Sequence, residues 1–154
     1  MVHRSPCAIP KKYPPEGIYK RRSSIYINTI MKKSENEKEV LVIDDNDITS
    51  SMIEAILGDA GFRVQVCADG TSALKWASAR CFSAYIIDYH IPKVNGDVLA
   101  AVFRKVCPAA IIIGCSIIPK EQTFLQAGAN YFIMKNDLVS HLLPTLTDAL
   151  SSKE

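Results

Sequence analysis

From Glu39 onward, the chain alternates five times between a short apolar run and a longer segment whose apolar residues recur at helical spacing. The apolar runs predict β-strands at residues 40–43, 63–68, 85–88, 110–115 and 131–134. The intervening segments predict helices at residues 48–60, from 69–71 onward, and at 97–107, 121–127 and 138–151. Such alternation requires right-handed crossovers and a parallel sheet covered by helices on both faces. It therefore predicts an α/β fold, and the chain length suits one domain.

Polar side chains stand where these predicted strands end. They are Asp44 and Asp45 after the first strand, Asp88 at the end of the third, Ser116 after the fourth and Lys135 after the fifth. In parallel α/β sheets the ligand lies beyond the carboxyl ends of the strands, so all of these groups should share one rim. Each acid taken alone is equally typical of a helix cap or a solvated loop. Their convergence on one rim is what favours a functional site.

The residue types on this rim suit phosphoryl transfer. Three neighbouring carboxylates repel one another unless a cation is bound. Mg²⁺ is the natural cation, because it takes oxygen ligands from carboxylates and also accepts a phosphate oxygen. Asp88 would then be free to attack phosphorus and form an acyl phosphate. Lys135 would neutralise one phosphate oxygen and Ser116 would hydrogen-bond another.

Residues 39–152 resemble the receiver domain of two-component response regulators, the CheY-like family. The segments that carry the resemblance are VLVIDDND, IIDYHIPKVNG, IIIGCS and AGANYFIMK, in the family's order and approximate spacing. The resemblance implies a flavodoxin-like five-stranded parallel sheet of order 2-1-3-4-5 with helices on both faces. It also implies a protein that is not an enzyme in the usual sense, since it catalyses only its own phosphorylation and dephosphorylation.

The same resemblance assigns a role to each residue of the metal and phosphoacceptor site. It implies that Asp88 is the phosphoacceptor and a magnesium ligand, and that Asp45 is a direct magnesium ligand. Asp44 would act on the metal largely through water. The backbone carbonyl of His90 would complete the protein's share of the metal site.

The resemblance also implies a switch. Ser116 and Lys135 would hold the phosphoryl oxygens, and Phe132 would be the aromatic residue whose rotamer reports phosphorylation. When Ser116 moves toward the phosphoryl group, Phe132 fills the space that it leaves. The face made by the fourth helix, the fifth strand and the fifth helix is then repacked, and a partner that binds only the repacked face senses phosphorylation.

We therefore expect a stand-alone receiver in the cytoplasm. Its donor would be the phosphohistidine of a sensor kinase or of a histidine phosphotransfer protein. Its output would be a downstream protein docked on the repacked face, or transfer of the phosphoryl group onward, and a phosphorylation-dependent dimer stays open. Nucleic-acid binding by the domain is not expected, because residues 34–154 carry ten basic against fifteen acidic side chains. No apolar run is long enough for a membrane span.

Residues 1–38 differ from the domain in charge and composition. Residues 1–33 contain eight Lys and Arg side chains against one Glu, and four prolines. This composition predicts a basic, disordered tail. The alternatives are a contact for nucleic acid or an acidic membrane, an organellar targeting segment, or a mis-assigned start with Met31 as the true first residue.

Four features depart from the family pattern. The residue after Lys135 is Asn136 where the family has a cis proline, so we expect a trans bond and a rearranged loop. Ile117 is bulky where the family has a small residue, and it would slow access to the site. The segment 116–128 is shorter than usual by about one helical turn. Pro144 lies within the last helix and should kink or divide it.

The chain has five cysteines without the close paired spacing of a zinc site. They are Cys7, Cys67, Cys81, Cys107 and Cys115. Their pattern predicts buried, reduced thiols and hence a reducing compartment.

Two other functions remain as alternatives. The segment from Asp45 to Thr49 fits the D-x-D-x-T signature of haloacid-dehalogenase-type phosphatases, with Asp45 as nucleophile and Asp88 without a role. The chain would be short for that fold and has no room for a cap domain. The other alternative keeps the receiver fold but not the switch, and makes the protein a constitutive protein-binding scaffold.

Overall fold

The computed structural model describes residues 38–153. The strands are β1 (Glu39–Ile43), β2 (Arg63–Cys67), β3 (Ala84–Asp88), β4 (Ile111–Ser116) and β5 (Tyr131–Met134). The helices are α2 (Asp47–Asp59), α3 (Gly70–Ala79), α4 (Gly96–Val106), α5 (Glu121–Ala127), the 3₁₀ turn η1 (Lys135–Asp137) and α6 (Leu138–Ser151). The predicted tail, apart from its last residue, and the alternative start at Met31 lie outside the described residues.

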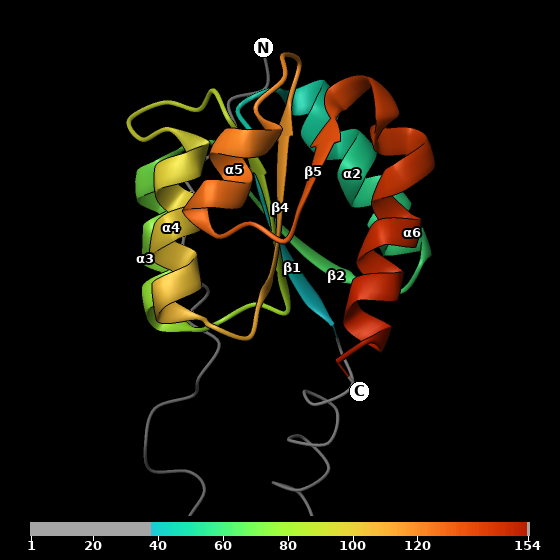
Figure 1. Cartoon of the computed structure of the whole chain (residues 1–154). Helices are drawn as coiled ribbons and strands as arrows, with labels where there is room; N and C mark the ends of the chain where they lie inside the picture. The colour runs from blue at the N-terminus through green and yellow to red at the C-terminus, as the bar shows by residue number, and fades with distance from the viewer. Residues whose placement is uncertain (1–37, 154) are drawn as a thin grey trace, which may run out of the picture.

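The five strands form one parallel sheet in the order β2-β1-β3-β4-β5, which confirms the predicted topology. Figure 1 shows α3, α4 and α5 on one face of the sheet and α2 and α6 on the other. Each face has its own apolar core. Within the described residues, no helix is both long and apolar enough to cross a membrane.

The central strands read as continuous apolar runs because both of their faces are covered. Every residue of β3 and β4 is buried. Side chains of a strand alternate between faces, so Tyr85 and Ile87 pack on the side of α3 and α4, whereas Ile86 packs on the side of α2 and α6. The sheet is therefore a rigid frame that holds the ends of its strands in fixed positions.

Side-chain caps fix where two helices begin after the strands. Asn46 caps α2 by accepting a hydrogen bond from the backbone N–H of Thr49 at 3.0 Å. Asp69 caps α3 by accepting hydrogen bonds from the backbone N–H of Ser72 at 2.8 Å and from its hydroxyl at 3.1 Å. Such caps satisfy backbone donors that have no partner within the helix. They make each helix begin close to the rim where the strands end.

The cysteine prediction is wrong for two residues. Cys81 and Cys107 form a disulfide, with their Cα atoms 5.7 Å apart, and Cys81 is exposed. Cys67 and Cys115 are buried and outside any disulfide, as predicted, and Cys7 lies outside the described residues. The pair was missed because its members are 26 residues apart and each simply ends a helical segment. They meet because α3 and α4 return side by side to the neighbouring strands β3 and β4.

Two departures from the family pattern have structural outcomes. Within residues 38–153 no peptide bond is cis, so the bond between Lys135 and Asn136 is trans, as predicted, and the chain makes the turn η1 there. Pro144 does not divide the last helix, because α6 runs without interruption from Leu138 to Ser151. Pro144 is exposed, so the backbone carbonyl that its ring leaves unbonded is on the solvent side.

Candidate functional site

Three carboxylates meet at the carboxyl edge of the sheet. Asp44 follows β1 directly, Asp45 is its neighbour, and Asp88 is the last residue of β3. Each offers one oxygen to a group in which all three oxygens lie within 4.8 Å of one another. Asp44 and Asp88 are buried, whereas Asp45 is exposed. The cluster is therefore buried on the side of Asp44 and Asp88 and open to solvent at Asp45.

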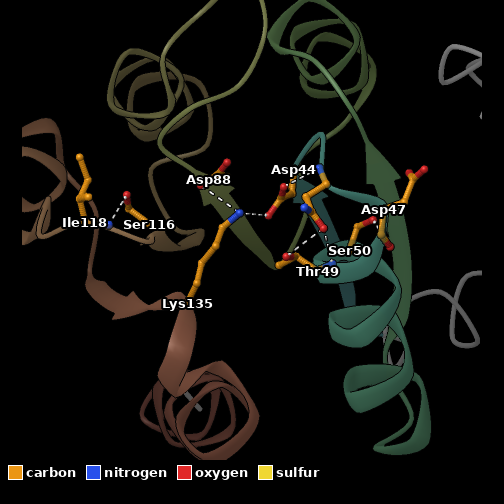
Figure 2. Close-up of polar contacts among 9 residues, drawn as sticks. Asp44, Asp47, Thr49, Ser50, Asp88, Ser116, Ile118 and Lys135 are labelled. Atoms are coloured by element: carbon orange, nitrogen blue, oxygen red, sulfur yellow. Dashed lines mark hydrogen bonds and ion pairs between the residues drawn. The ribbon is translucent and has the colours of Figure 1, made fainter.

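The side chain of Lys135 reaches into this cluster from the end of β5. Its Nζ lies 2.8 Å from Oδ2 of Asp44 and 3.4 Å from Oδ1 of Asp88, and Figure 2 shows it pointing between these two carboxylates. Burial alone would lower the pKa of Lys135, but the hydrogen bond and the charge of Asp44, together with Asp88, outweigh burial and raise it. Lys135 is therefore a fixed positive charge shared between two acids.

The carboxyl group of Asp88 has a perturbed pKa. Burial raises its pKa, the negative charge of Asp44 raises it further, and Lys135 opposes both, with a resulting pKa of about 6. Ionising this carboxyl group is costly because it is buried beside the negative charge of Asp44. The positive charge of Lys135 offsets these two effects only in part. The cluster is therefore short of positive charge and suits a divalent cation bound through oxygen.

Backbone groups at Asn46 and Gly96 position the acids. The backbone N–H of Asn46 donates to Oδ1 of Asp44 at 2.8 Å, so one residue both caps α2 and orients an acid. Gly96 lets the loop after β3 fold closely over Asp88. A Cβ at Gly96 would lie 2.2 Å from the backbone oxygen of Asp88, and the N–H of Gly96 donates to the carbonyl of Tyr89 at 2.9 Å. Two features of the sequence indicate these contacts: Asn46 stands just before a helix, and a glycine is typical of a close approach of the backbone.

Ser116 ends β4 and is fully buried. Its hydroxyl accepts a hydrogen bond from the backbone N–H of Ile118 at 3.2 Å, a contact visible to the left of Asp88 in Figure 2. The side chain of Ile117 is 69% exposed and points to solvent rather than into the core. This bond uses one lone pair of the hydroxyl oxygen, and the O–H can still donate to another group.

An aromatic chain leads away from the site on the α5 side. Tyr89, next to Asp88, packs edge-on against Phe124, and Phe124 packs against Phe132 with ring centroids 5.9 Å apart. Phe124 is fully buried over Gly114, where a Cβ would lie 2.3 Å from its ring. Phe132 is half-buried and lines a pocket of about 470 Å³ between α5 and α6, with Met134 and His141 among its walls. The ring of Phe124 thus separates Phe132, the predicted switch residue, from Tyr89.

His90 lies on the loop after β3, is exposed, and has its ring 4.8 Å from that of Tyr89. Its backbone carbonyl stays a predicted metal ligand. Opposite this loop, Nζ of Lys120 lies 4.5 Å from the ring centroid of Tyr89. Of the predicted site residues, the structure joins Asp44, Asp88 and Lys135 by direct contacts and places Asp45 in the same cluster, and it leaves Ser116 bonded elsewhere.

The response regulator receiver domain family matches residues 40–146, which is more than half of the chain, and the chain belongs to that family. It is therefore a CheY-like signalling module of two-component systems and not a catalytic enzyme. This assignment replaces the haloacid-dehalogenase alternative, which left Asp88 without a role.

Three of the similar proteins come from Xanthomonas, Vibrio and Burkholderia. The sensory/regulatory protein RpfC of Xanthomonas campestris is 30% identical over 125 residues, which cover 75% of this chain and 17% of that protein. The chemotaxis response regulator CheY4 of Vibrio cholerae has 27% identity and a TM-score of 0.69, covering 74% of this chain and 99% of that one. A response regulator protein from Burkholderia pseudomallei, solved with a phosphorylated aspartic acid, calcium ion and citrate, has 26% identity and a TM-score of 0.67. It covers 76% of this chain and 71% of that chain.

This chain spans less than half the length of the curated relatives that it matches. The part of it that matches the receiver domain family carries the acidic pocket of Asp44, Asp45 and Asp88. That pocket suits a divalent metal.

Proposed function

We propose that this receiver accepts a phosphoryl group on Asp88 from the phosphohistidine of a sensor kinase or a histidine phosphotransfer protein. The observation that carries the proposal is the position of Lys135, whose Nζ contacts both Asp44 and Asp88 at the rim of the sheet. A carboxylate of Asp88 forms the new bond to phosphorus while the phosphorus–nitrogen bond of the donor breaks. The electron pair of that bond goes to the imidazole nitrogen of the donor.

The residues of the rim divide the work of positioning and charge neutralisation, which is what phosphoryl transfer chiefly asks of a protein. Lys135 would keep its contact with Asp44 and would pair with an oxygen of the phosphoryl group on Asp88. Asp44, Asp45 and Asp88, with the carbonyl of His90, would hold Mg²⁺. When bound, this ion supplies positive charge to the phosphoryl oxygens. The calcium ion and phosphorylated aspartic acid named for the Burkholderia protein support this choice of site chemistry.

The proposed switch begins at Ser116. The N–H of Ile118 donates to its hydroxyl, so a shift of Ser116 toward a phosphoryl oxygen would draw the segment that follows β4 along with it. Phe132 can then turn into the space that Ser116 leaves. The ring of Phe132 already packs on the buried ring of Phe124, so this turn would keep it against the core. We propose that the resulting change on α5, β5 and α6 controls a downstream protein or passes the phosphoryl group on. It would do so in the cytoplasm, where its donors act.

The test is phosphorylation of the full chain by phosphoramidate with Mg²⁺, followed by intact-mass analysis and borohydride trapping of the acyl phosphate. We expect one magnesium-dependent adduct, located on Asp88 and absent from Asp88→Asn. Asp69→Asn is the matched control, because Asp69 also lies at the end of a strand but caps a helix. It should label like the wild type.

Other outcomes identify other functions. An adduct on Asp45 would sink the receiver mechanism in favour of a hydrolase-like nucleophile. If the wild type stays unlabelled, Ile117→Ala separates a blocked site from a lost one. Labelling restored by Ile117→Ala would mean restricted access, and continued absence of labelling would favour the constitutive scaffold.

A further inference from the structure

We propose that Cys81 and Cys107 form a reversible thiol–disulfide site that exchanges with a low-molecular-weight thiol of the glutathione class, with Cys81 as the sulfur that is attacked. The site lies at the amino ends of β3 and β4, the edge of the sheet opposite Asp88 and Ser116. Figure 1 shows the two loops that carry it below α3 and α4, away from the ends of the strand arrows.

The two sulfurs have unequal access. Cys81 is exposed, whereas Cys107 is 3% exposed. A thiolate must approach the sulfur that it attacks, so exchange begins at the accessible partner. This asymmetry assigns Cys81 as the attacked residue and Cys107 as the resolving one.

The structure also offers space for the attacking molecule. A pocket of about 320 Å³ opens directly beside the disulfide and is lined by Cys81, Cys107 and the residues that follow each of them. Its size lies at the lower end of the range for small-molecule sites in proteins. A small thiol can therefore reach the sulfur from a cavity rather than from a flat surface.

The wall that carries Cys107 is held independently of the disulfide. The guanidinium of Arg104 donates to the carbonyls of Pro108 at 2.7 Å, Ala110 at 2.9 Å and Gly128 at 2.9 Å. The backbone N–H of Cys107 also donates to the carbonyl of Phe103 at 2.7 Å and closes α4. Because these bonds do not depend on the sulfur, Cys107 keeps its place after reduction and stays able to re-form the bond.

A neighbouring hydroxyl suits the chemistry of the leaving sulfur. The hydroxyl of Tyr85 donates a hydrogen bond to Sγ of Cys107 at 3.3 Å and accepts one from the N–H of Phe82 at 3.2 Å. When a thiolate bonds to Cys81, the bond between the two cysteines breaks and its electron pair goes to Cys107. The Tyr85 hydroxyl stabilises that thiolate until it takes a proton from water in the pocket.

A second small thiolate completes the reduction. It attacks the small-molecule sulfur of the mixed disulfide, releases Cys81 as a thiolate, and leaves as the small-molecule disulfide. In sum, one protein disulfide and two small thiols give two protein thiols and one small disulfide. Disulfides in reducing compartments are usually of this transient kind. The inference does not depend on phosphorylation of Asp88.

The experiment incubates the full chain in mixtures of reduced and oxidised glutathione, quenches with acid, and maps tryptic peptides without reduction. Oxidation should link peptide 81–93 to peptide 106–120 through Cys81 and Cys107. A tenfold change in the ratio [GSH]²/[GSSG] should shift the dithiol-to-disulfide ratio tenfold, as a two-electron exchange requires. The transient mixed disulfide of the wild type should be on Cys81.

Variants test the assignment of the two sulfurs. Cys107→Ser should accumulate glutathione on Cys81, Cys81→Ser should take up none at Cys107, and Cys7→Ser should behave like the wild type. Three results would overturn the proposal: no linked peptide in any mixture, a linked peptide that no excess of reduced glutathione opens, or a wild-type adduct on Cys107. The position of the glutathione adduct is measured on the wild-type protein, so this test holds even where a variant fails to fold.

Discussion

Replacing Lys135 by methionine tests the charge arrangement at the centre of the site. Its Nζ lies 2.8 Å from Asp44 and 3.4 Å from Asp88, and the two carboxylates are only 3% and 7% exposed. At an effective dielectric constant of about 20, Coulomb's law gives about 6 and about 5 kcal/mol for these distances, much of which desolvation offsets. Removing one partner of a buried pair typically costs about 3–5 kcal/mol. We expect Lys135→Met to lose about 3 kcal/mol at pH 8 without added metal.

Urea unfolding followed by circular dichroism measures this loss. With a slope of about 1.5 kcal/mol per M, the midpoint should fall by about 2 M. The matched control is Lys93→Met, because Lys93 pairs with Asp69 at 3.8 Å but is 61% exposed, and such pairs contribute less than about 1 kcal/mol. Added Mg²⁺ should restore part of the loss in Lys135→Met and none in Lys93→Met. Equal losses in the two variants would refute the assignment of Lys135 as the counterion of the buried acids.

Three further outcomes follow from the structure. Gly96→Ala should cost about 1–3 kcal/mol in urea unfolding and slow phosphoramidate labelling, because its Cβ would lie 2.2 Å from the backbone oxygen of Asp88; unchanged labelling would contradict this. Asp69→Ala should cost about 1 kcal/mol at pH 7, and Asp69→Asn less. The backbone hydrogen bond at the start of α3 lowers the pKa of Asp69 below 3.8, so this contribution is present above pH 3.8 and is lost as pH falls through the folded-state pKa. Reducing the bond between Cys81 and Cys107 should cost about 3.5 kcal/mol by loop entropy, measured as the urea midpoint with and without dithiothreitol, and a loss below about 1 kcal/mol would show that the link does not constrain the unfolded chain.

The sequence by itself determined the fold and most of the candidate site. Strand and helix periods are local properties of the chain, and their alternation admits few topologies. Polar residues that follow apolar strands must then meet at one edge of a parallel sheet. For this reason the sequence alone predicts that Asp44, Asp88 and Lys135 lie together, as they do in the structure.

The tertiary structure decided what depends on distances between segments that are far apart in the sequence. Nothing in the pattern indicates that Cys81 and Cys107 approach each other, since their meeting depends on how two helices return to neighbouring strands. The hydroxyl of Ser116 bonds Ile118 rather than a group near Asp88, because that choice depends on the path of the following loop. Periodicity places a residue on a face or at an edge, whereas packing alone decides which atoms touch.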